Sequence, residues 1–405
     1  MENRKSGTNI RIDKYKSTAT MNPAQYSQNP LFSVLIQPFT PQPIFGWAVG
    51  LMLAFVSLFA PSAIAQATKT GVEQPKYTSS DQPMQLFDAK GKKITYTQWL
   101  QTLKKELNPT VPTIILFGEL HDNPLVHWLQ LQTTQDLYMI SPNMALGAEM
   151  FETDQQLALN EYLKPTDTSA QKTQTSVSPM GAMFGQDPHY TKLKNAVKLW
   201  PNFKTDYKPL VDFAKENDLP FIATNVPRKY ANLVYRGGVK ALDTLSAEQK
   251  SLCPPLPFPY DSTLTCYADI FKATGGHGGQ NLPMSQAIKD AAMAWNIMQN
   301  LQPSIGPEAG NGSRISNTTN YSNLTPQPRI FIHYNGTYHS DNHQSIEWYL
   351  QTYAADQGKI SNLPLKINVV TIGARTQSQV KKLDAENKNI ADLIIVTIDN
   401  ITKTH

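Results

Sequence analysis

Cysteine is scarce in this chain of 405 residues, which contains only Cys253 and Cys266. So few cysteines exclude a fold held together by a disulfide framework. The two lie in one proline-rich stretch, so a local disulfide is expected in an oxidising compartment, and a pair of free thiols is the alternative. No cysteine lies near the apolar N-terminal segment, which excludes a lipoprotein anchored through an N-terminal cysteine.

A strong charge of either sign is also missing. The formal net charge is +4, and residues 66–405 contain 31 basic and 30 acidic residues. Charge therefore gives no support for a nucleic-acid partner. Hydrophobic residues make up 40% of the chain, and its length allows a large core in one or two domains.

No charged residue occurs between Lys16 and Lys69, and the apolar segment 44–60 lies in this gap. The small-x-small sequence Ala63-Ile64-Ala65, which signal peptidase accepts, follows it. We therefore expect a signal peptide cleaved after Ala65 and an exported protein, periplasmic or associated with the cell envelope. The alternative is an uncleaved N-terminal membrane anchor, because the apolar segment is at the lower limit of length for a membrane span.

These signals divide the chain into three parts: a leader (1–65), a linker (66–85) and a folded domain (86–405). The domain carries two stretches of low complexity, at 164–185 and 302–327, which we interpret as insertions.

Short apolar runs alternate with helical patterns along the domain, which predicts an α/β fold with a mostly parallel sheet flanked by helices. The expected strands are 113–117, 144–149, 220–224, 329–334, 367–372 and 393–398. Helices are expected at 96–107, 124–138, 190–199, 207–217, 284–301 and 344–353, after Arg228, and after a capping box of Thr153 and Gln156.

The first of these strands ends in a candidate site. Its apolar run leads into Gly118, and Glu119 and His121 follow directly. Asn123 and Pro124 then read as the N-cap and first residue of a helix. Glu119 and His121 are therefore expected in a loop at the carboxyl end of a strand, where open α/β sheets bind their ligands. The alternative is a turn with two solvated polar residues.

The same Gly-x-x-His pattern recurs at Gly336 and His339, again after an apolar strand. In both motifs the glycine is expected to permit a tight turn. Two further strands end in polar residues, Glu149 and Arg228, so four strand ends deliver groups that can meet. A cation in the first turn of a helix opposes the helix dipole, so Arg228 suggests an anionic partner, with a surface salt bridge as the alternative.

With these motifs the chain resembles the haem-binding uptake proteins of the ChaN type, in the Tiki, TraB and erythromycin-esterase superfamily. The resemblance extends from Leu86 to Thr397 and is carried by FGELHDNPLVHWLQ, LGAEMF, DYKPLVDFAKEN, NVPRKYANLV, SQAIKDAAMAWNI and HYNGTYHSDN. Members of the superfamily carry two Gly-x-x-His motifs, a glutamate and an arginine. These correspond here to His121, His339, Glu149 and Arg228, with Glu119 inside the first motif.

The resemblance implies one of two functions. The first is binding of haem or iron for uptake, with Arg228, His277, Tyr338 and His339 as candidates for the haem ligand and the propionate contact. The second is a metal-dependent hydrolase acting on a small molecule or peptide, in which His121, Glu149 and His339 hold a divalent transition metal. Glu119 or Glu149 would then be the general base, and Arg228 would hold an oxyanion or a substrate carboxylate.

A catalytically silent envelope scaffold is a third reading. Membrane association through the N-terminal apolar segment and a homodimer both stay open. For three further polar residues, a purely structural role is expected beside the functional one. His127 is expected to be packed or capping, and His343 to precede a helix, while Asp290 either completes the site or forms a helical salt bridge.

Overall fold

The protein is described by a computed structural model that covers residues 82–108, 111–165, 188–273, 279, 281–301, 330–361 and 366–405. The predicted leader, nearly all of the linker, and most of the two predicted insertions lie outside these residues. The chain divides into two units, Met1–Gln74 and Pro75–His405, and every described residue belongs to the second. None of the helices described here is long and apolar enough to cross a membrane.

One eight-stranded sheet forms the centre of this unit, in the order β2-β1-β8-β7-β3-β6-β4-β5. The strands are β1 (Met84–Asp88), β2 (Lys93–Ile94), β3 (Thr113–Glu119), β4 (Met144–Glu152), β5 (Phe221–Asn225), β6 (Ile330–Gly336), β7 (Asn368–Gln377) and β8 (Leu393–Ile398). Neighbours from β8 to β5 run parallel, and β1 is antiparallel to both of its neighbours. The predicted α/β class is confirmed. The strands β1 and β2, at one side of the sheet, were not predicted, and β1 begins inside the segment expected to be linker.

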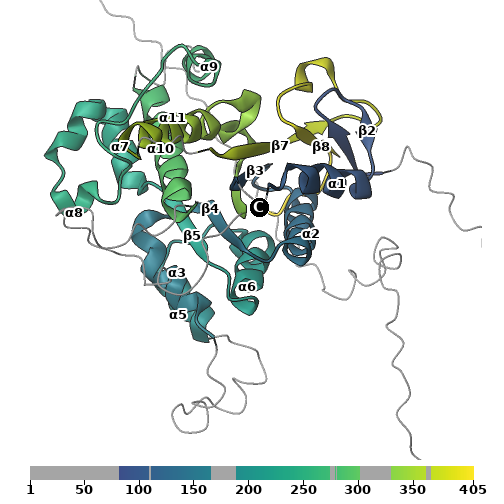
Figure 1. Ribbon diagram of the computed structural model, residues 1–405, viewed down its shortest axis with the longest axis horizontal. Helices are drawn as coiled ribbons and strands as arrows, with labels where there is room; N and C mark the ends of the chain where they lie inside the picture. The colour runs from purple at the N-terminus through teal and green to yellow at the C-terminus, as the bar shows by residue number, and fades with distance from the viewer. Residues whose placement is uncertain are drawn as a thin grey trace, which may run out of the picture. The chain divides into compact units, whose positions relative to one another are not determined.

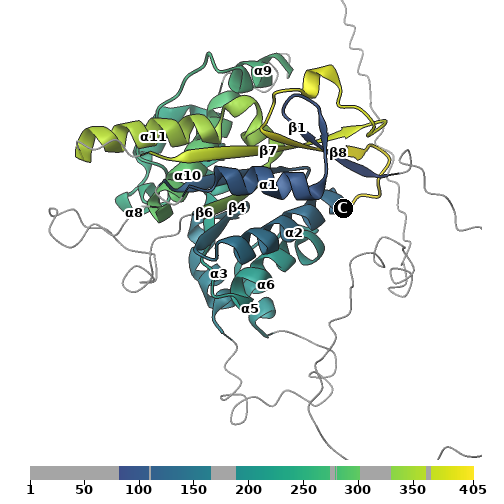
Figure 2. The same ribbon diagram turned by 45° about the vertical axis from the view of Figure 1, so that its right-hand side comes forward.

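Helices cover both faces of the sheet (Figures 1 and 2). In chain order the main ones are α1 (Tyr96–Glu106), α2 (Pro124–Ile140), α3 (Gln156–Leu163), α5 (Pro188–Ala196), α6 (Lys208–Glu216), α7 (Arg228–Gly237), α8 (Ala247–Lys250), α9 (Thr265–Ala273), α10 (Leu282–Leu301) and α11 (Ile346–Ser361). Residues of α1, α2, α3, α5 and α6 share one hydrophobic core, and those of α7, α9, α10 and α11 share a second.

Strand β3 explains how the sheet serves both cores. Ile115 and Phe117 belong to the first core, whereas Ile114 and Leu116 belong to the second. All four side chains have no exposed surface. A strand buried on both faces needs apolar residues at every position, which is the pattern that the sequence shows.

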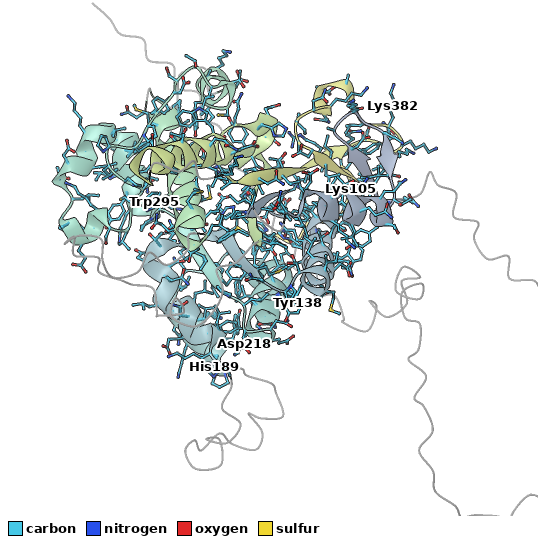
Figure 3. The ribbon with its side chains drawn as sticks, in the orientation of Figure 1. Lys105, Tyr138, His189, Asp218, Trp295 and Lys382 are labelled. Carbon is cyan, nitrogen blue, oxygen red and sulfur yellow. The ribbon has the colours of Figure 1, made fainter. Side chains whose placement is uncertain are left out.

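Aromatic pairs join neighbouring helices within each layer. Tyr138 of α2 meets Phe213 of α6 edge to face, with ring centroids 5.5 Å apart. On the other face Trp295 of α10 meets Tyr353 of α11 at the same separation. Figure 3 labels Tyr138 and Trp295, which lie on these two different layers. Each pair fixes the spacing of two helices that cover the sheet.

The adjacent strands β3 and β6 are followed by helices on opposite faces, α2 on one and α11 on the other. In open α/β sheets, ligands bind at such a switch, outside the carboxyl ends of the strands. In the β3 and β6 pairing, Glu119 stands opposite Gly336. The two Gly-x-x-His motifs therefore leave the sheet at the same level and on neighbouring strands.

Some local predictions are confirmed and others are wrong. Asn123 caps α2 through its side chain, with Pro124 as the first helical residue. The expected capping box of Thr153 and Gln156 is wrong, because Glu152 and Gln155 form it around a 3-10 helix, Thr153–Gln155. The expected disulfide is absent as well, since Cys253 and Cys266 are both free.

Candidate functional site

The first motif holds a buried carboxylate against a partly exposed imidazole. Glu119 is 1% exposed, and its Oε1 lies 2.9 Å from Nδ1 of His121. The carboxylate also accepts hydrogen bonds from Gln130 Nε2 (2.8 Å) and the Tyr207 hydroxyl (2.7 Å). Burial would lower the pKa of His121, but the bond and charge of Glu119 outweigh it and raise the pKa. The Glu119 carboxylate therefore favours the protonated form of the His121 imidazole.

The second motif holds its histidine between two carboxylates. His339 Nδ1 lies 2.5 Å from Oδ1 of Asp290, and its Nε2 lies 3.3 Å from Oε1 of Glu149. Asp290 also accepts a hydrogen bond from the Tyr267 hydroxyl at 2.7 Å. Burial would lower the pKa of His339, but the charges of Glu149 and Asp290 outweigh it and raise the pKa to about 10. The imidazole is thus a buried cation with both ring nitrogens engaged.

Glu149 joins the two motifs. Its Oε2 accepts a hydrogen bond from the Gly336 amide at 2.7 Å. A Cβ on Gly336 would lie 3.0 Å from Nε2 of His121 and 3.5 Å from Oε2 of Glu149. Both motifs and Glu149 therefore meet at Gly336, as the sequence predicted for His121, Glu149 and His339.

The glycines of the two motifs do not have the backbone role that the sequence predicted. Neither Gly118 nor Gly336 has a positive φ. A Cβ on Gly118 would lie 2.5 Å from the Ile372 carbonyl oxygen and 2.9 Å from Cα of Thr337. The predicted tight turn is wrong, and what each glycine allows is a close approach between neighbouring segments.

One of the predicted residues stands apart from this cluster. Arg228 is exposed at the first position of α7, where its backbone amide bonds to the Glu152 carboxylate. No described contact joins Arg228 to Glu149 or to either motif histidine. Asn225, at the end of β5, does not cap α7, and its side-chain amide donates instead to the Glu149 carbonyl oxygen at 3.0 Å. His277 lies outside the described residues.

Tyr338 differs from its neighbour His339 in being open to solvent. It is 43% exposed, whereas His339 is 8% exposed, and the two rings meet edge to face at 6.4 Å. The Tyr338 hydroxyl donates to the Cys266 carbonyl oxygen. Partial burial raises the pKa of Tyr338, as does the neighbouring Cys266, so the phenol is protonated at neutral pH.

A second arginine lies at this edge of the sheet, and sequence reasoning did not identify it. Arg375 of β7 bonds to Oδ2 of Asp341 at 2.7 Å and to Oγ1 of Thr337, inside the second motif, at 3.1 Å. Asp341 in turn accepts from Thr337 at 3.1 Å. The sequence did contain a signal for Arg375, because this residue follows an apolar run just as the other polar groups of the site do.

The supports of the first motif were also missed. Asn202 donates to the His121 carbonyl oxygen at 2.6 Å and to Oδ2 of Asp206, also at 2.6 Å. The Trp200 ring meets the His121 ring edge to face at 4.8 Å. Asn202 directly precedes a π-helix, Phe203–Tyr207, and Asp206 lies within it. Such helices are rare and frequently lie at functional sites, but periodicity does not reveal them.

Two further histidines, His127 and His343, have the structural roles expected for them. His127 is buried, and its ring nitrogens contact Oε1 of Gln130 at 2.9 Å and the His121 carbonyl oxygen at 3.1 Å. It is a packed residue that supports the first loop. His343 pairs instead with Glu347, at 3.0 Å.

The donor types suit a divalent metal, but their arrangement does not. His121 and His339 each turn Nδ1 to a carboxylate, which is how proteins orient metal-binding imidazoles. Glu149, however, is bonded to His339. Across the described ranges, no three His, Cys, Asp or Glu side chains form a group that could hold a metal ion. The three-ligand set therefore stays a prediction.

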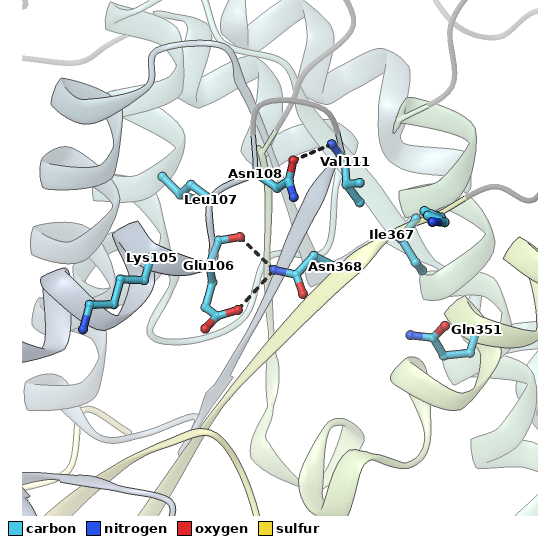
Figure 4. Close-up of a pocket in the computed structure, with 9 residues that line it drawn as sticks. Lys105, Glu106, Leu107, Asn108, Val111, Gln351, Ile367 and Asn368 are labelled. Carbon is cyan, nitrogen blue, oxygen red and sulfur yellow. Dashed lines mark hydrogen bonds between the residues drawn. The ribbon is translucent and has the colours of Figure 1, made fainter.

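A pocket of about 580 Å³ opens at the other end of the sheet, where β3 and β7 begin (Figure 4). Asn368 lies in its wall and donates to the Glu106 carbonyl oxygen at 2.8 Å. The lining residues are Lys105, Glu106, Leu107, Asn108, Val111, Gln351, Lys366, Ile367 and Asn368. They include no histidine and no residue of either motif, so the chemistry places the candidate site at the carboxyl end instead.

Residues 111–350 match the family model described as haem-binding uptake, Tiki superfamily, ChaN. The chain belongs to this family. The matched segment of this ChaN-like chain contains both motifs, Glu149, Asp290 and Arg228. No curated protein matches the chain.

Solved structures show distant likenesses to this ChaN-like chain. ChaN of Campylobacter jejuni, solved with cofacially bound haem, has a TM-score of 0.44 and 15% identity, covering 78% of this chain and 98% of its own. A Bacillus cereus protein has a TM-score of 0.36 and 10% identity, covering 74% and 91%. A mutant of the erythromycin esterase EreC in its open conformation has a TM-score of 0.36 and 9% identity, covering 78% and 83%.

Proposed function

We propose that this protein binds haem, or the iron that haem carries, at the carboxyl edge where the two motifs meet, and that it serves haem or iron acquisition outside the cytoplasm. The observation that supports this most is the family match, whose segment 111–350 includes every group of the candidate site except Arg375 and the supports near the C-terminus. Export is supported only by the apolar segment 44–60 and the small residues up to Ala65.

Tyr338 is the best described candidate for the iron ligand. Haem iron accepts a tyrosine oxygen as an axial ligand. The ring of Tyr338 is 43% exposed, and its hydroxyl has one hydrogen bond, to a backbone carbonyl. His339 is a poorer candidate, because both of its nitrogens face carboxylates and its side chain is nearly closed to solvent.

Haem also needs cations for its propionates and an apolar surface for its ring. Arg228 is exposed and Arg375 is partly exposed at the sheet edge, so both have guanidinium groups that an anion can reach. The Trp200 ring beside His121 supplies aromatic surface. The residues present fit haem in their chemistry.

The test is a titration of the full chain with haemin, followed by absorption spectroscopy. We expect a saturable shift of the Soret band at a defined stoichiometry. A spectrum that stays the sum of free haemin and protein at every ratio would refute the proposal. Tyr235→Phe, which changes another exposed tyrosine, is the matched control for a Tyr338→Phe variant in the same titration.

A hydrolase is a second candidate, favoured by the two carboxylate and histidine pairs. The His121 side chain is 38% exposed while Glu119 holds its Nδ1, so the ring is oriented and partly open to solvent. An imidazole held in this way can take a proton from a water or substrate hydroxyl once it is neutral. A divalent metal, if bound by His121, Glu149 and His339, would lower the pKa of a bound water.

Metal analysis of the isolated protein and turnover of a panel of ester and peptide substrates test this candidate. Stoichiometric metal or turnover that is lost in His121→Ala would support it. Neither metal nor turnover in the wild type would contradict it. Haemin binding that survives His121→Ala would favour haem capture over hydrolysis.

A further inference from the structure

The C-terminal residues 399–404, called the C-terminal strap below, run along the carboxyl edge of the sheet. They follow β8, and the Asp399 amide donates to the Gln377 carbonyl oxygen of β7 at 3.0 Å. Farther on, the Thr404 amide donates to the Asp122 carbonyl oxygen, also at 3.0 Å. Figures 1 and 2 both mark the C-terminus beside α2, the helix that begins just after the first motif. The strap thus joins β8 to the loop that carries His121.

Three contacts attach the end of the strap. Besides the backbone bond, Lys403 Nζ lies 2.7 Å from Oδ2 of Asp122. The Thr404 hydroxyl donates to Oδ2 of Asp206 at 2.6 Å. Asp206 is 4% exposed, so this bond joins a carboxylate that is shielded from water. The lysine contact is weaker, because the Lys403 side chain is 60% exposed.

Both partners of Thr404 act on His121. Asp122 is the next residue in the loop, so its carbonyl bond restrains the backbone there. Asp206 Oδ2 also accepts from Asn202, and Asn202 donates to the carbonyl oxygen of His121. The same oxygen of Asp206 therefore receives one hydrogen bond from the strap and one from the residue that holds His121. The strap is the most distant segment in sequence that reaches this loop, and it lies beyond the family match, which ends at residue 350.

We propose that the C-terminal strap is a positioning element for the first motif, with Thr404 as its decisive residue. Thr404 holds Asp122 and Asp206 together, and this keeps the His121 ring between Trp200 and the Gly336 backbone. Without the strap the loop opens more often and the ring leaves that position. The consequence for ligand binding rests on the proposed function, but the consequence for the loop does not.

The first test compares Thr404→Val, Thr404→Ser and Thr402→Val in the full chain. Valine keeps the shape of threonine without its hydroxyl, serine keeps the hydroxyl, and Thr402 is an exposed control in the same segment. Hydrogen exchange is followed over residues 118–127, where the Asn123 amide closes the loop onto the Leu120 carbonyl oxygen. Loss of a hydrogen bond to a charged group should speed exchange there about tenfold or more.

A second measurement distinguishes a positioning role of the strap from a general loss of stability. We expect the neighbouring Trp200 ring, whose centroid lies 4.8 Å away, to shift the His121 ring proton resonances, which are assigned with His121→Gln. We expect Thr404→Val to move them toward ordinary histidine values, and Thr404→Ser to restore them. Unchanged exchange and resonances in Thr404→Val would overturn the proposal, and so would equal effects of the serine and valine variants.

Haemin titration of the same variants separates this inference from the proposed function. If the wild type binds haemin, we expect weaker binding in Thr404→Val and wild-type binding in Thr402→Val. If the wild type does not bind haemin, the proposed function fails, while exchange and the ring resonances still decide whether the strap positions the loop.

Discussion

The two Gly-x-x-His loops end neighbouring strands at the same level, yet they place their histidines in different surroundings. The His121 side chain is 38% exposed and has a carboxylate partner two residues away in its own motif. The His339 side chain is 10% exposed, and its partners come from two other elements, β4 and α10. A motif places a histidine at the sheet edge, but its surroundings decide whether the imidazole can meet a ligand or serves the interior.

The contacts that hold the two loops in place also differ. The first loop is held mainly through its backbone, by Asn202 and Thr404. The second loop is held through side chains, by the contacts of Arg375 and Asp341 with Thr337. Tyr338 is 43% exposed, so the second loop presents a phenol to solvent although its histidine is internal. Each loop thus contributes one group to the surface, His121 from the first and Tyr338 from the second.

The largest effect should come from removing the buried partner of the second loop. Asp290→Ala leaves a buried imidazolium without its closest carboxylate and the Tyr267 hydroxyl without its acceptor. Breaking a buried pair from one side costs about 3–5 kcal/mol of unfolding free energy. Urea unfolding measures it, with Asp269→Ala as control, because the Asp269 pair with Lys272 is exposed. A loss no larger than in this control would show that Asp290 does not stabilise the second loop.

The two motif glycines should separate stability from site geometry. An alanine at Gly118 meets backbone atoms of Ile372 and Thr337, which cannot move aside, so overpacking should cost about 1–3 kcal/mol. An alanine at Gly336 meets the far end of the His121 ring, which can rotate. We expect Gly336→Ala to unfold nearly like the wild type but to displace the His121 resonances. Equal losses of stability in both variants would contradict this difference.

The pH dependence of stability should arise from the second loop more than from the first. The pKa of His339 is raised from its ordinary 6.5 to about 10 in the folded protein, so its contribution is fully present below pH 6.5 and is lost as the pH rises toward 10. One such group lowers the unfolding free energy by about 1.4 kcal/mol per pH unit within that window. Unfolding in urea from pH 6.5 to 8.5 measures the slope. We expect His339→Gln to reduce this slope. An unchanged slope would show that the pH dependence arises from other groups.

The smallest effects should distinguish the ion pairs of the two loops. Arg375 and Asp341 are 22% and 13% exposed in their side chains, and Arg375→Ala also removes the bond to Thr337. We expect a loss of about 2 kcal/mol. Lys403 is far more exposed, so Lys403→Ala should cost about 0.5 kcal/mol or less. Thermal unfolding of both variants gives the order, and a larger loss for Lys403 would reverse it.

The sequence predicted the parallel strands and the meeting of the motifs because both depend on local patterns. Apolar runs ending in glycine indicate strands buried on both faces, and carboxyl ends of parallel strands share one edge. The strands β1 and β2 were missed because β2 has only two residues and the hairpin contains three exposed lysines, Lys90, Lys92 and Lys93. An edge hairpin of this kind has no apolar alternation to read.

Partners that are distant in sequence could not be predicted in the same way. Asp290 was left between a site residue and a salt bridge, because the sequence does not show which face of α10 meets His339. Tyr207 and Asp206 come from a π-helix, whose irregular turn no periodic pattern signals. Thr404 and Arg375 reach the motifs only through the order of strands in the sheet, and that order is set by the tertiary fold.

The most direct test of the account is the spectrum of the ferric haemin complex of Tyr338→Phe beside that of the wild type and of His339→Gln. If Tyr338 is the group that the second loop presents to haem, the wild type shows the charge-transfer absorption of a phenolate bound to iron. Tyr338→Phe then loses this absorption, and His339→Gln keeps it. The same spectrum in Tyr338→Phe as in the wild type would contradict the account.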